Sequence, residues 1–329
     1  MIWLTWRQSR VQTLVAAGAL AILAVILAIT GPQLVHLYDT TVATCHAHHD
    51  CQIAVNAFTS HDGALQNLTS FLMQAVPGLI GVFWGTPLIA RELEARTHRL
   101  AWTQTVTRGR WLVVKLGLTA LASMAAAGLL TLMVTWWSSP FDRIINSPLD
   151  PGLFSERGIA PIGYAAFAFA LGGTAGLLIR RTVPAMAVTI AVFAGVQAAF
   201  GLWLRAHLIA PIRVVSPLIM GQMTGVGITA PGNHLSVSVT PNLPGAWLYS
   251  SQVTTATGST NLGTAPQACV HLMNHLCNPA ISRMHLLQIV TYQPASRYWV
   301  FQWYETAIYV ALALALAGFC FLWARRRVS

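Results

Sequence analysis

The fold is decided by residues 91–115, RELEARTHRLAWTQTVTRGRWLVVK, a charged island between two hydrophobic runs. The island holds five arginines, one lysine and two glutamates, whereas charged residues make up only 9% of the whole chain. Such a stretch must lie in water, while each flanking run is long and apolar enough to cross a bilayer. Because basic loops stay on the cytoplasmic side, the island predicts a membrane protein with this loop in the cytoplasm.

Composition also places the chain among membrane proteins. Hydrophobic residues make up 55% of it and the mean hydropathy is +0.59, values that are rare for a soluble domain. The net charge of +10 would suit nucleic acid, but the basic residues stand at the ends of apolar runs and not in a stripe interleaved with aromatics. We interpret them as topology signals and anchors to the lipid bilayer, and expect no nucleic-acid partner.

Six apolar runs predict six transmembrane helices, each close to the ~20 residues that cross ~30 Å of hydrocarbon. They cover residues 13–30, 71–90, 112–137, 159–179, 183–204 and 303–323. The basic residues before the first run also suit a signal peptide, but no small-x-small cleavage site follows, so we expect a retained span. The fifth run is rich in Gly and Ala, which predicts close helix packing there. Residues 1–12 pair two Trp with two Arg, which predicts an amphipathic interfacial segment or, alternatively, a plain charged flank.

Basic residues set the predicted orientation. Thirteen Lys and Arg fall on the cytoplasmic side of this assignment and six on the outer side, so both termini are expected in the cytoplasm. The predicted fold class is an all-α membrane protein with six transmembrane helices. Residues 1–204 hold the amphipathic segment and helices 1–5 with the loop 91–115, residues 205–302 form an extracytoplasmic loop domain, and residues 303–329 form helix 6 and a cytoplasmic tail.

The stretch 205–302 is too long for a bare connection, so we expect it to fold. Leu235, Val237 and Val239 alternate with polar residues, as in a strand with one buried face. Turn signals at 231–233 (Pro-Gly-Asn) and 241–242 (Pro-Asn) flank this pattern. The prediction is a small, partly β subdomain between helices 5 and 6.

Four of the five cysteines lie in the predicted outer regions, where the environment oxidises thiols, so disulfides are expected. They are Cys45, Cys51, Cys269 and Cys277. Pairing Cys45 with Cys51 and Cys269 with Cys277 closes the smallest loops, although four cysteines allow three connectivities that sequence does not separate. Cys320 lies in the last run and is expected to be an inert apolar residue.

Ten of the eleven histidines also fall in the outer regions, including three in the segment CHAHHDC at 45–51 and the pair His271 and His275. Imidazoles spaced i, i+4 on a helix can share zinc or copper. A short polar loop bounded by cysteines is more commonly a stapled surface. We therefore predict no metal site, with metal binding by this histidine cluster as the less favoured alternative.

Catalytic motifs are missing from the sequence. It contains no G-x-x-x-x-G-K-[ST] phosphate loop, no H-E-x-x-H and no G-x-S-x-G, which argues against an enzyme. Among the nine carboxylates, Glu305 alone lies at a predicted span, and an acid in a membrane is a functional candidate. Its neighbours Trp303 and Tyr304 place it at the outer interface, where we expect it to pair with Arg297; a proton or substrate role is the alternative.

The island resembles the cytoplasmic loop of type-2 ATP-binding-cassette exporter permeases, which reads R-E-x-E-x-G-T, then T-P-x-S-R, then G-K. The residues that carry the resemblance are, in order, Arg91, Glu92, Glu94, Thr97, Thr105, Arg108, Arg110 and Lys115. This sequence departs from the pattern with Arg96 in place of Gly, with no proline in the turn, and with Val114 before Lys115. The segment YQPASRYW at 292–299 and the six spans extend the resemblance over nearly the whole chain.

The resemblance implies a permease subunit in a bacterial plasma membrane, working as two permease copies, expected to be a homodimer, with two separate nucleotide-binding subunits. ATP and Mg would bind those partners, and this chain would hold no cofactor. A cytoplasmic helix of the loop would dock on the ATPase, with the charged residues fixing the docking and Leu93, Leu100 and Trp102 as apolar anchors. The residues implied for docking are Arg91, Glu92, Leu93, Glu94, Thr97, Arg99, Leu100 and Trp102. Alternatively, these charges only cap two helices and hold the topology.

The function implied by this resemblance is export of an amphiphilic or hydrophobic substrate, such as a drug, a peptide antibiotic or a lipid. The path would follow the interface between two permease copies, lined by spans such as the second and the fifth. Two alternatives belong to other classes: a membrane receptor or sensor that uses the outer domain, and an intramembrane metal-dependent enzyme. An ATPase gene beside this one would favour transport over the receptor, and metal analysis would test the enzyme.

Overall fold

A computed structural model describes residues 2–45, 51–61, 63–94, 108–144, 147–219, 223–229, 234–266, 269 and 274–327. The chain divides into two compact units. The helical unit comprises residues 1–144, 151–208 and 299–329, and the β unit comprises residues 145–150 and 209–298.

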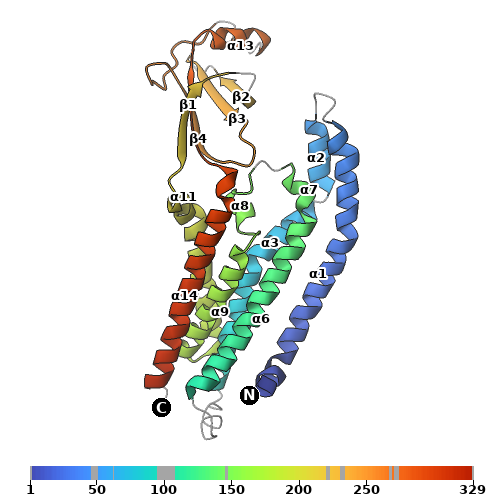
Figure 1. Ribbon diagram of the computed structural model, residues 1–329, viewed down its shortest axis with the longest axis vertical. Helices are drawn as coiled ribbons and strands as arrows, with labels where there is room; N and C mark the ends of the chain where they lie inside the picture. The colour runs from blue at the N-terminus through green and yellow to red at the C-terminus, as the bar shows by residue number, and fades with distance from the viewer. Residues whose placement is uncertain are drawn as a thin grey trace. The chain divides into compact units, whose positions relative to one another are not determined.

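Long helices account for most of the helical unit (Figure 1). They are α1 (Ile2–Cys45), α2 (Gln52–His61), α3 (Gly63–Ile80), α4 (Thr86–Glu94), α6 (Arg108–Trp137), α9 (Ala160–Ile179), α10 (Thr182–Ala199) and α14 (Tyr298–Arg327). Short helices are α7 (Ser139–Asp142), α8 (Pro151–Phe154) and α11 (Arg205–Leu208), and two π-helical turns are η1 (Gly81–Gly85) and η2 (Phe200–Leu204).

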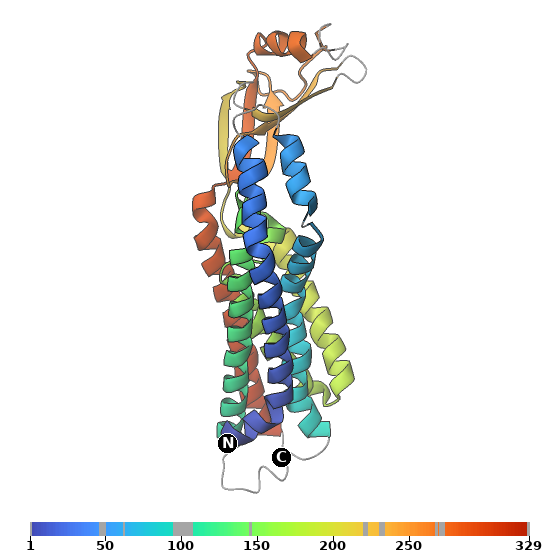
Figure 2. The ribbon, with the colours of Figure 1, turned by 90° about the vertical axis from the view of Figure 1, so that its right-hand side faces the viewer.

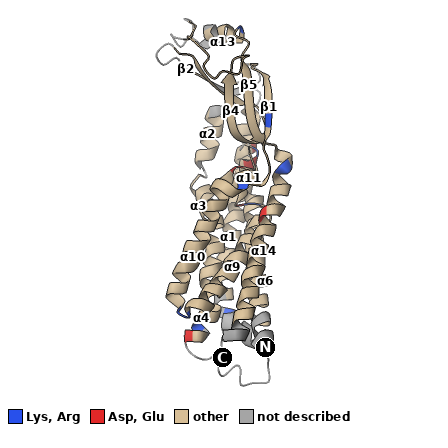
Figure 3. Ribbon diagram, turned by 90° about the vertical axis from the view of Figure 1, so that its left-hand side faces the viewer, with Lys and Arg blue, Asp and Glu red and all other residues tan. Residues whose placement is uncertain are grey.

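Six helical segments among the described residues are long and apolar enough to cross a bilayer, which confirms the six predicted spans. In chain order they are Thr13–Cys45, Gly63–Arg91, Leu116–Trp137, Ala160–Ile179, Thr182–Leu208 and Ala295–Trp323. Figure 2 shows that α1 begins and α14 ends at the same end of the helical unit. Charged residues are sparse along the middle of these helices (Figure 3), as a hydrocarbon environment requires.

The first span extends well past its predicted end at residue 30. Helix α1 continues through Pro32 to Cys45 and also includes residues 2–12, so the predicted interfacial segment is part of one helix. Tertiary packing explains this, because Gly31 lies against the Trp136 ring, where a Cβ would come within 2.9 Å. Trp137 Nε1 also donates a 2.9 Å hydrogen bond to Thr30 Oγ1. Membrane helices tolerate a proline where neighbouring groups compensate for the lost backbone hydrogen bond.

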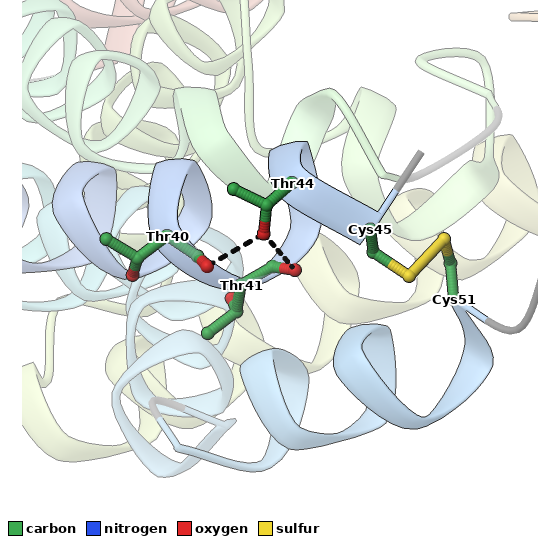
Figure 4. Close-up of a disulfide and its surroundings, with 5 residues drawn as sticks. All are labelled: Thr40, Thr41, Thr44, Cys45 and Cys51. Atoms are coloured by element: carbon green, nitrogen blue, oxygen red, sulfur yellow. Dashed lines mark hydrogen bonds between the residues drawn. A yellow bond between two sulfur atoms is a disulfide. The ribbon is translucent and has the colours of Figure 1, made fainter. Parts of the chain in front are cut away.

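A disulfide closes the turn between α1 and α2. Cys45 pairs with Cys51 across 5.4 Å between their Cα atoms (Figure 4). The hydroxyl of the preceding residue, Thr44, donates to the carbonyl oxygens of Thr40 and Thr41 one turn earlier. Phe58 of α2 is buried between Tyr38 and Phe141. The described residues of the polar stretch after the first span are therefore mostly helical, and Phe58 packs against both α1 and α7.

The second and fourth spans pack with their backbones in contact. A Cβ added to Gly81 or Gly85 of η1 would lie 2.5 Å from a carbonyl oxygen of α9, and one added to Gly172 of α9 would lie 2.2 Å from the Gly81 carbonyl oxygen. Small residues permit this approach. By contrast, a Cβ added to Gly195 or Gly201 of the fifth span would meet no described atom of this chain within 4 Å, so these glycines do not pack closely within the single chain.

The described residues of the β unit form two small antiparallel sheets. One sheet has the order β1 (Ile212–Pro217), β5 (Leu287–Gln293), β4 (Trp247–Thr254), and the other pairs β2 (Met223–Thr229) with β3 (Ser236–Pro241). The unit also contains α13 (Asn274–Ser282) and the 3₁₀ turn η5 (Ala295–Arg297). Val237 and Val239 point into a core that includes the Cys269–Cys277 disulfide, while their strand neighbours are exposed. The predicted strand and both nearest-neighbour disulfides are confirmed.

Gly172→Ala is expected to destabilise the helical unit by about 1–3 kcal/mol, because the new methyl group would overlap the Gly81 carbonyl oxygen. The check is the free energy of unfolding of purified protein in detergent. Gly195→Ala is the matched control, since its methyl group would meet open space and alanine favours a helix by about 1 kcal/mol. Equal destabilisation by both changes would contradict a limiting contact between η1 and α9.

Candidate functional site

An ion pair is completely buried in the helical unit. Arg205 at the start of α11 is 1% exposed and Glu305 of α14 is 0% exposed. The guanidinium donates to both carboxylate oxygens, from Nε to Oε2 and from Nη2 to Oε1, each at 2.9 Å. Charges removed from water are tolerated only when paired and fully hydrogen-bonded, so this pair requires further partners.

Those partners come from α8 and α9. Arg205 Nη1 donates to the Pro151 carbonyl oxygen at 3.0 Å, and Nη2 also donates to Ser155 Oγ at 2.9 Å. The guanidinium carbon lies 4.2 Å from the centroid of the Phe154 ring, at cation–π distance. On the other side, the Tyr164 hydroxyl donates to Glu305 Oε1 at 2.5 Å. The pair therefore joins the fifth and sixth spans to the fourth span and to α8.

The predicted partner of Glu305 was Arg297, and the structure places a different arginine there. Arg297 Nη1 instead donates to the Ala210 carbonyl oxygen at 2.8 Å and to Gln293 Oε1 at 2.6 Å. Arg297 lies in the 3₁₀ turn η5, eight positions before Glu305. Arg205 was assigned to the outer loop, but the fifth span includes it and ends at Leu208. A lone arginine at the end of an apolar run was the signal that sequence reasoning missed.

Gln302, one turn before Glu305, caps α9. Its Oε1 accepts from the backbone N–H groups of Ile159 and Ala160 at 3.0 and 2.9 Å, and its Nε2 donates to the carbonyl oxygens of Phe154 and Arg157. The first N–H groups of a helix have no partner within the helix, so a buried helix end requires such a side chain. Gln302 of the sixth span therefore holds the start of the fourth span, and the residues just before it, through four hydrogen bonds.

Aromatic side chains connect the buried ion pair to α10. The Tyr309 ring lies 4.7 Å from Tyr164 and 4.7 Å from Phe200, measured between centroids. Its hydroxyl donates to Oε1 of Gln197. Gln197 thereby connects the buried polar network to a cavity.

That cavity, of about 580 Å³, lies between α3, α8 and the end of α10 with η2. We call it the α3–α10 cavity. Its walls include Phe71, Gln74, Ser155, Phe193, Gln197 and Leu202. Behind Gln74 stands Glu156, which is 5% exposed and accepts hydrogen bonds from Ser70 Oγ at 2.9 Å and from Gln74 Nε2 at 3.3 Å.

A second cavity, of about 490 Å³, lies between α1, α3 and α6 and is lined by aliphatic and aromatic side chains such as Leu20, Val76 and Trp84. Apart from the indole N–H of Trp84, the side chains of these walls carry no polar group that could orient a ligand. A small number of placed polar groups is what distinguishes a selective site, so the α3–α10 cavity is the stronger candidate.

The predicted docking residues are only partly described. Arg91 and Glu94 are exposed, and Leu93 is partly buried against the cluster of Ile89, Leu177 and Cys320. The side chain of Glu92, and Thr97, Arg99, Leu100 and Trp102, lie outside the described residues. No described residue tests their role.

Glu94 makes an unpredicted contact at the start of α10. Its Oε2 accepts from Thr182 Oγ1 at 2.7 Å and from the Thr182 N–H at 3.2 Å. These hydrogen bonds, from the hydroxyl first and the N–H second, lower the pKa of Glu94 below its usual 4.5, with a smaller contribution from Arg181. The end of the second span is thus connected to the start of the fifth.

The predicted histidine cluster cannot be placed, since residues 46–50 and 271–273 and the His275 side chain lie outside the described residues. Within the described part of the chain, no group of three or more His, Cys, Asp and Glu is arranged to hold a metal ion.

Comparison with known families identifies the helical unit. The family model described as ABC-2 membrane transporter related matches residues 17–205, which is more than half of the chain. The chain belongs to this ABC-2 family. The match runs from α1 to Arg205, so it covers the island and nearly all of the first five spans of this ABC-2 permease. Neither the curated proteins nor the solved structures contain a significant match.

Replacing one partner of the buried pair in this ABC-2 permease, by Arg205→Met or Glu305→Met, is expected to cost about 3–5 kcal/mol, because the remaining charge stays buried without its partner. The double replacement should cost much less than the two single costs together. Reversible unfolding in mixed detergent measures the three values. Strictly additive costs would contradict direct coupling of the two charges.

Thr182→Val is expected to raise the pKa of Glu94 toward 4.5, because it removes the strongest hydrogen bond to the carboxylate. A lowered pKa means that the contact contributes stability above pH 4.5, and this contribution disappears as the pH falls through the lowered value. Carboxyl-carbon NMR titration measures the shift. Arg181→Gln should raise the pKa less, and a larger rise than that of Thr182→Val would contradict this ranking of causes.

Proposed function

We propose that this ABC-2 permease is the membrane subunit of an exporter that moves an amphiphilic or hydrophobic molecule outward, driven by ATP hydrolysis on a separate subunit. The family supports a permease. The observation that carries the more specific proposal is the α3–α10 cavity, because its apolar walls and few polar groups suit an amphiphile.

The second and fifth spans would form the moving walls. They are connected at one end by Glu94 and Thr182, and further along by a 3.2 Å hydrogen bond between the hydroxyls of Thr86 and Thr189. Gly78 then packs against Ile190 and Phe193, where an added Cβ would lie about 3 Å from both side chains. Beyond this contact, residues of both spans line the α3–α10 cavity. A tilt imposed at the Glu94 end would therefore change the width of the cavity.

We propose that the tilt is imposed through the island. In this mechanism the ATPase binds residues between α4 and α6, using the docking residues named above, and closure of the ATPase dimer moves α4. Glu94 passes the displacement to α10 through Thr182. The π-turns η1 and η2 interrupt the regular hydrogen bonding of both spans, and such turns are common at functional sites.

Two copies of the permease and two ATPases would form the working exporter. Several large apolar side chains beside the cavity are exposed in the single chain, with Phe71 at 67% and Leu202 at 85%. We propose that these faces of α3 and η2 meet lipid or the second permease copy. The island and both termini would lie in the cytoplasm of a bacterial cell, and the β unit would lie outside the membrane on the other side.

Co-purification with ATP-binding-cassette ATPases encoded in the same genome tests this proposal. Wild type should retain an ATPase, and Glu92→Arg should reduce its recovery at least several-fold by reversing a charge in the docking loop. Asp39→Arg is the matched control, since it makes the same reversal at an exposed position of α1 away from the island. If no candidate ATPase binds wild type, the exporter proposal fails and a receptor that uses the β unit becomes the better explanation.

A further inference from the structure

Two glutamines face the α3–α10 cavity from opposite walls. Gln74 comes from α3 and Gln197 from α10. A glutamine amide offers a carbonyl oxygen as acceptor and an amino group as donor, and a protein partner at one end fixes the orientation of the amide and leaves the other end wholly available to a ligand. Both of these amides have a partner on the protein side.

The buried carboxylate of Glu156 orients Gln74. Gln74 Nε2 donates to Glu156 Oε1 at 3.3 Å, and Ser70 holds the other carboxylate oxygen. An ionised carboxylate only accepts hydrogen bonds, so turning the Gln74 amide over would bring two oxygens together. The Gln74 carbonyl oxygen is consequently the end available to a ligand.

The buried aromatic cluster orients Gln197 the opposite way. The Tyr309 hydroxyl donates to Gln197 Oε1, and the Tyr309 side chain is held between Tyr164 and Phe200. With its oxygen engaged, Gln197 has its amino group available to a ligand. The cavity therefore offers one acceptor on α3 and one donor on α10.

From this arrangement we infer that the cargo carries a peptide-type amide, whose N–H meets the Gln74 oxygen and whose carbonyl group meets the Gln197 amino group. Every residue of a peptide backbone supplies such a pair of groups. Phe71, Phe193 and Leu202 supply apolar surface for its side chains. The inference rests on the proposed transport function and narrows the cargo from amphiphiles in general to hydrophobic peptides.

A pair of matched probes tests the amide directly. One is acetyl-Leu-Leu-Leu-amide, and the other is its depsipeptide, in which an ester oxygen replaces the central N–H. Binding is measured by isothermal titration to the full chain in lipid nanodiscs, with no ATPase present. Wild type should bind the amide roughly fivefold to tenfold more tightly, the ratio that one neutral hydrogen bond supplies.

Variants assign this preference to one residue. Gln74→Met removes the acceptor with little change of shape and should remove most of the preference for the amide over the ester. Gln197→Met should weaken both probes, because both retain a carbonyl group, and should keep most of the preference, because the N–H contact with Gln74 remains. Gln33→Met changes an exposed glutamine of α1 and should alter neither affinity nor preference.

Equal affinity of wild type for the two probes, binding of neither probe, or a preference that Gln74→Met leaves undiminished would overturn the inference. These outcomes are separate from failure of the proposed function. If wild type retains an ATPase in the co-purification but shows no preference for the amide probe, only the inference about peptide cargo is rejected and the exporter proposal stands. Amide preference without any bound ATPase rejects ATP-driven export and leaves peptide binding in place.

Discussion

The contact between the backbones of η1 and α9 is the constraint on which the rest of the helical unit depends. Gly81, Gly85 and Gly172 approach carbonyl oxygens so closely that no side chain fits between them. Lipid tails are as apolar as leucine, so membrane helices gain little from hydrophobic burial and depend on close packing of this kind. Helix α9 is accordingly the most buried of the six spans, and the other spans are arranged around it.

Polar contacts then fix how the outer helices meet this centre. Gln302 locks α14 to the first turn of α9, and the Arg205–Glu305 pair ties α11 to α14. In a dry interior an unpaired charge is costly, so alternative registers of these helices, which would separate the two charges, are strongly disfavoured. The same network ends at Gln197, so the orientation of one cavity residue depends on charges that no ligand touches.

Hydropathy predicted the six spans, and alternation predicted the strand with Val237 and Val239 buried, because both signals are local. The partner of Glu305 was not predictable in this way. Arg205 lies 100 positions earlier, and its pairing depends on the mutual rotation of three helices. The end of the first span was missed for a similar reason, since the packing of Gly31 against Trp136 keeps the helix going through Pro32. In the sequence, Gln74 and Gln197 look like ordinary polar residues. The orientation of their amides depends on hydrogen bonds to the buried side chains of Glu156 and Tyr309, which the sequence does not reveal.

The length of α1 has a further consequence, which concerns the bilayer itself. Its helical segment Thr13–Cys45, of 33 residues, extends about 50 Å, whereas the hydrocarbon layer is about 30 Å thick. Only 11% of its most apolar stretch is buried within the single chain. Because the helix turns polar after residue 30, with His36 and Asp39, its extra length would project from the hydrocarbon layer and not create a hydrophobic mismatch. Thr30 and Gly31, which contact Trp136 and Trp137 of α6, would then lie near the level at which α1 leaves the hydrocarbon layer.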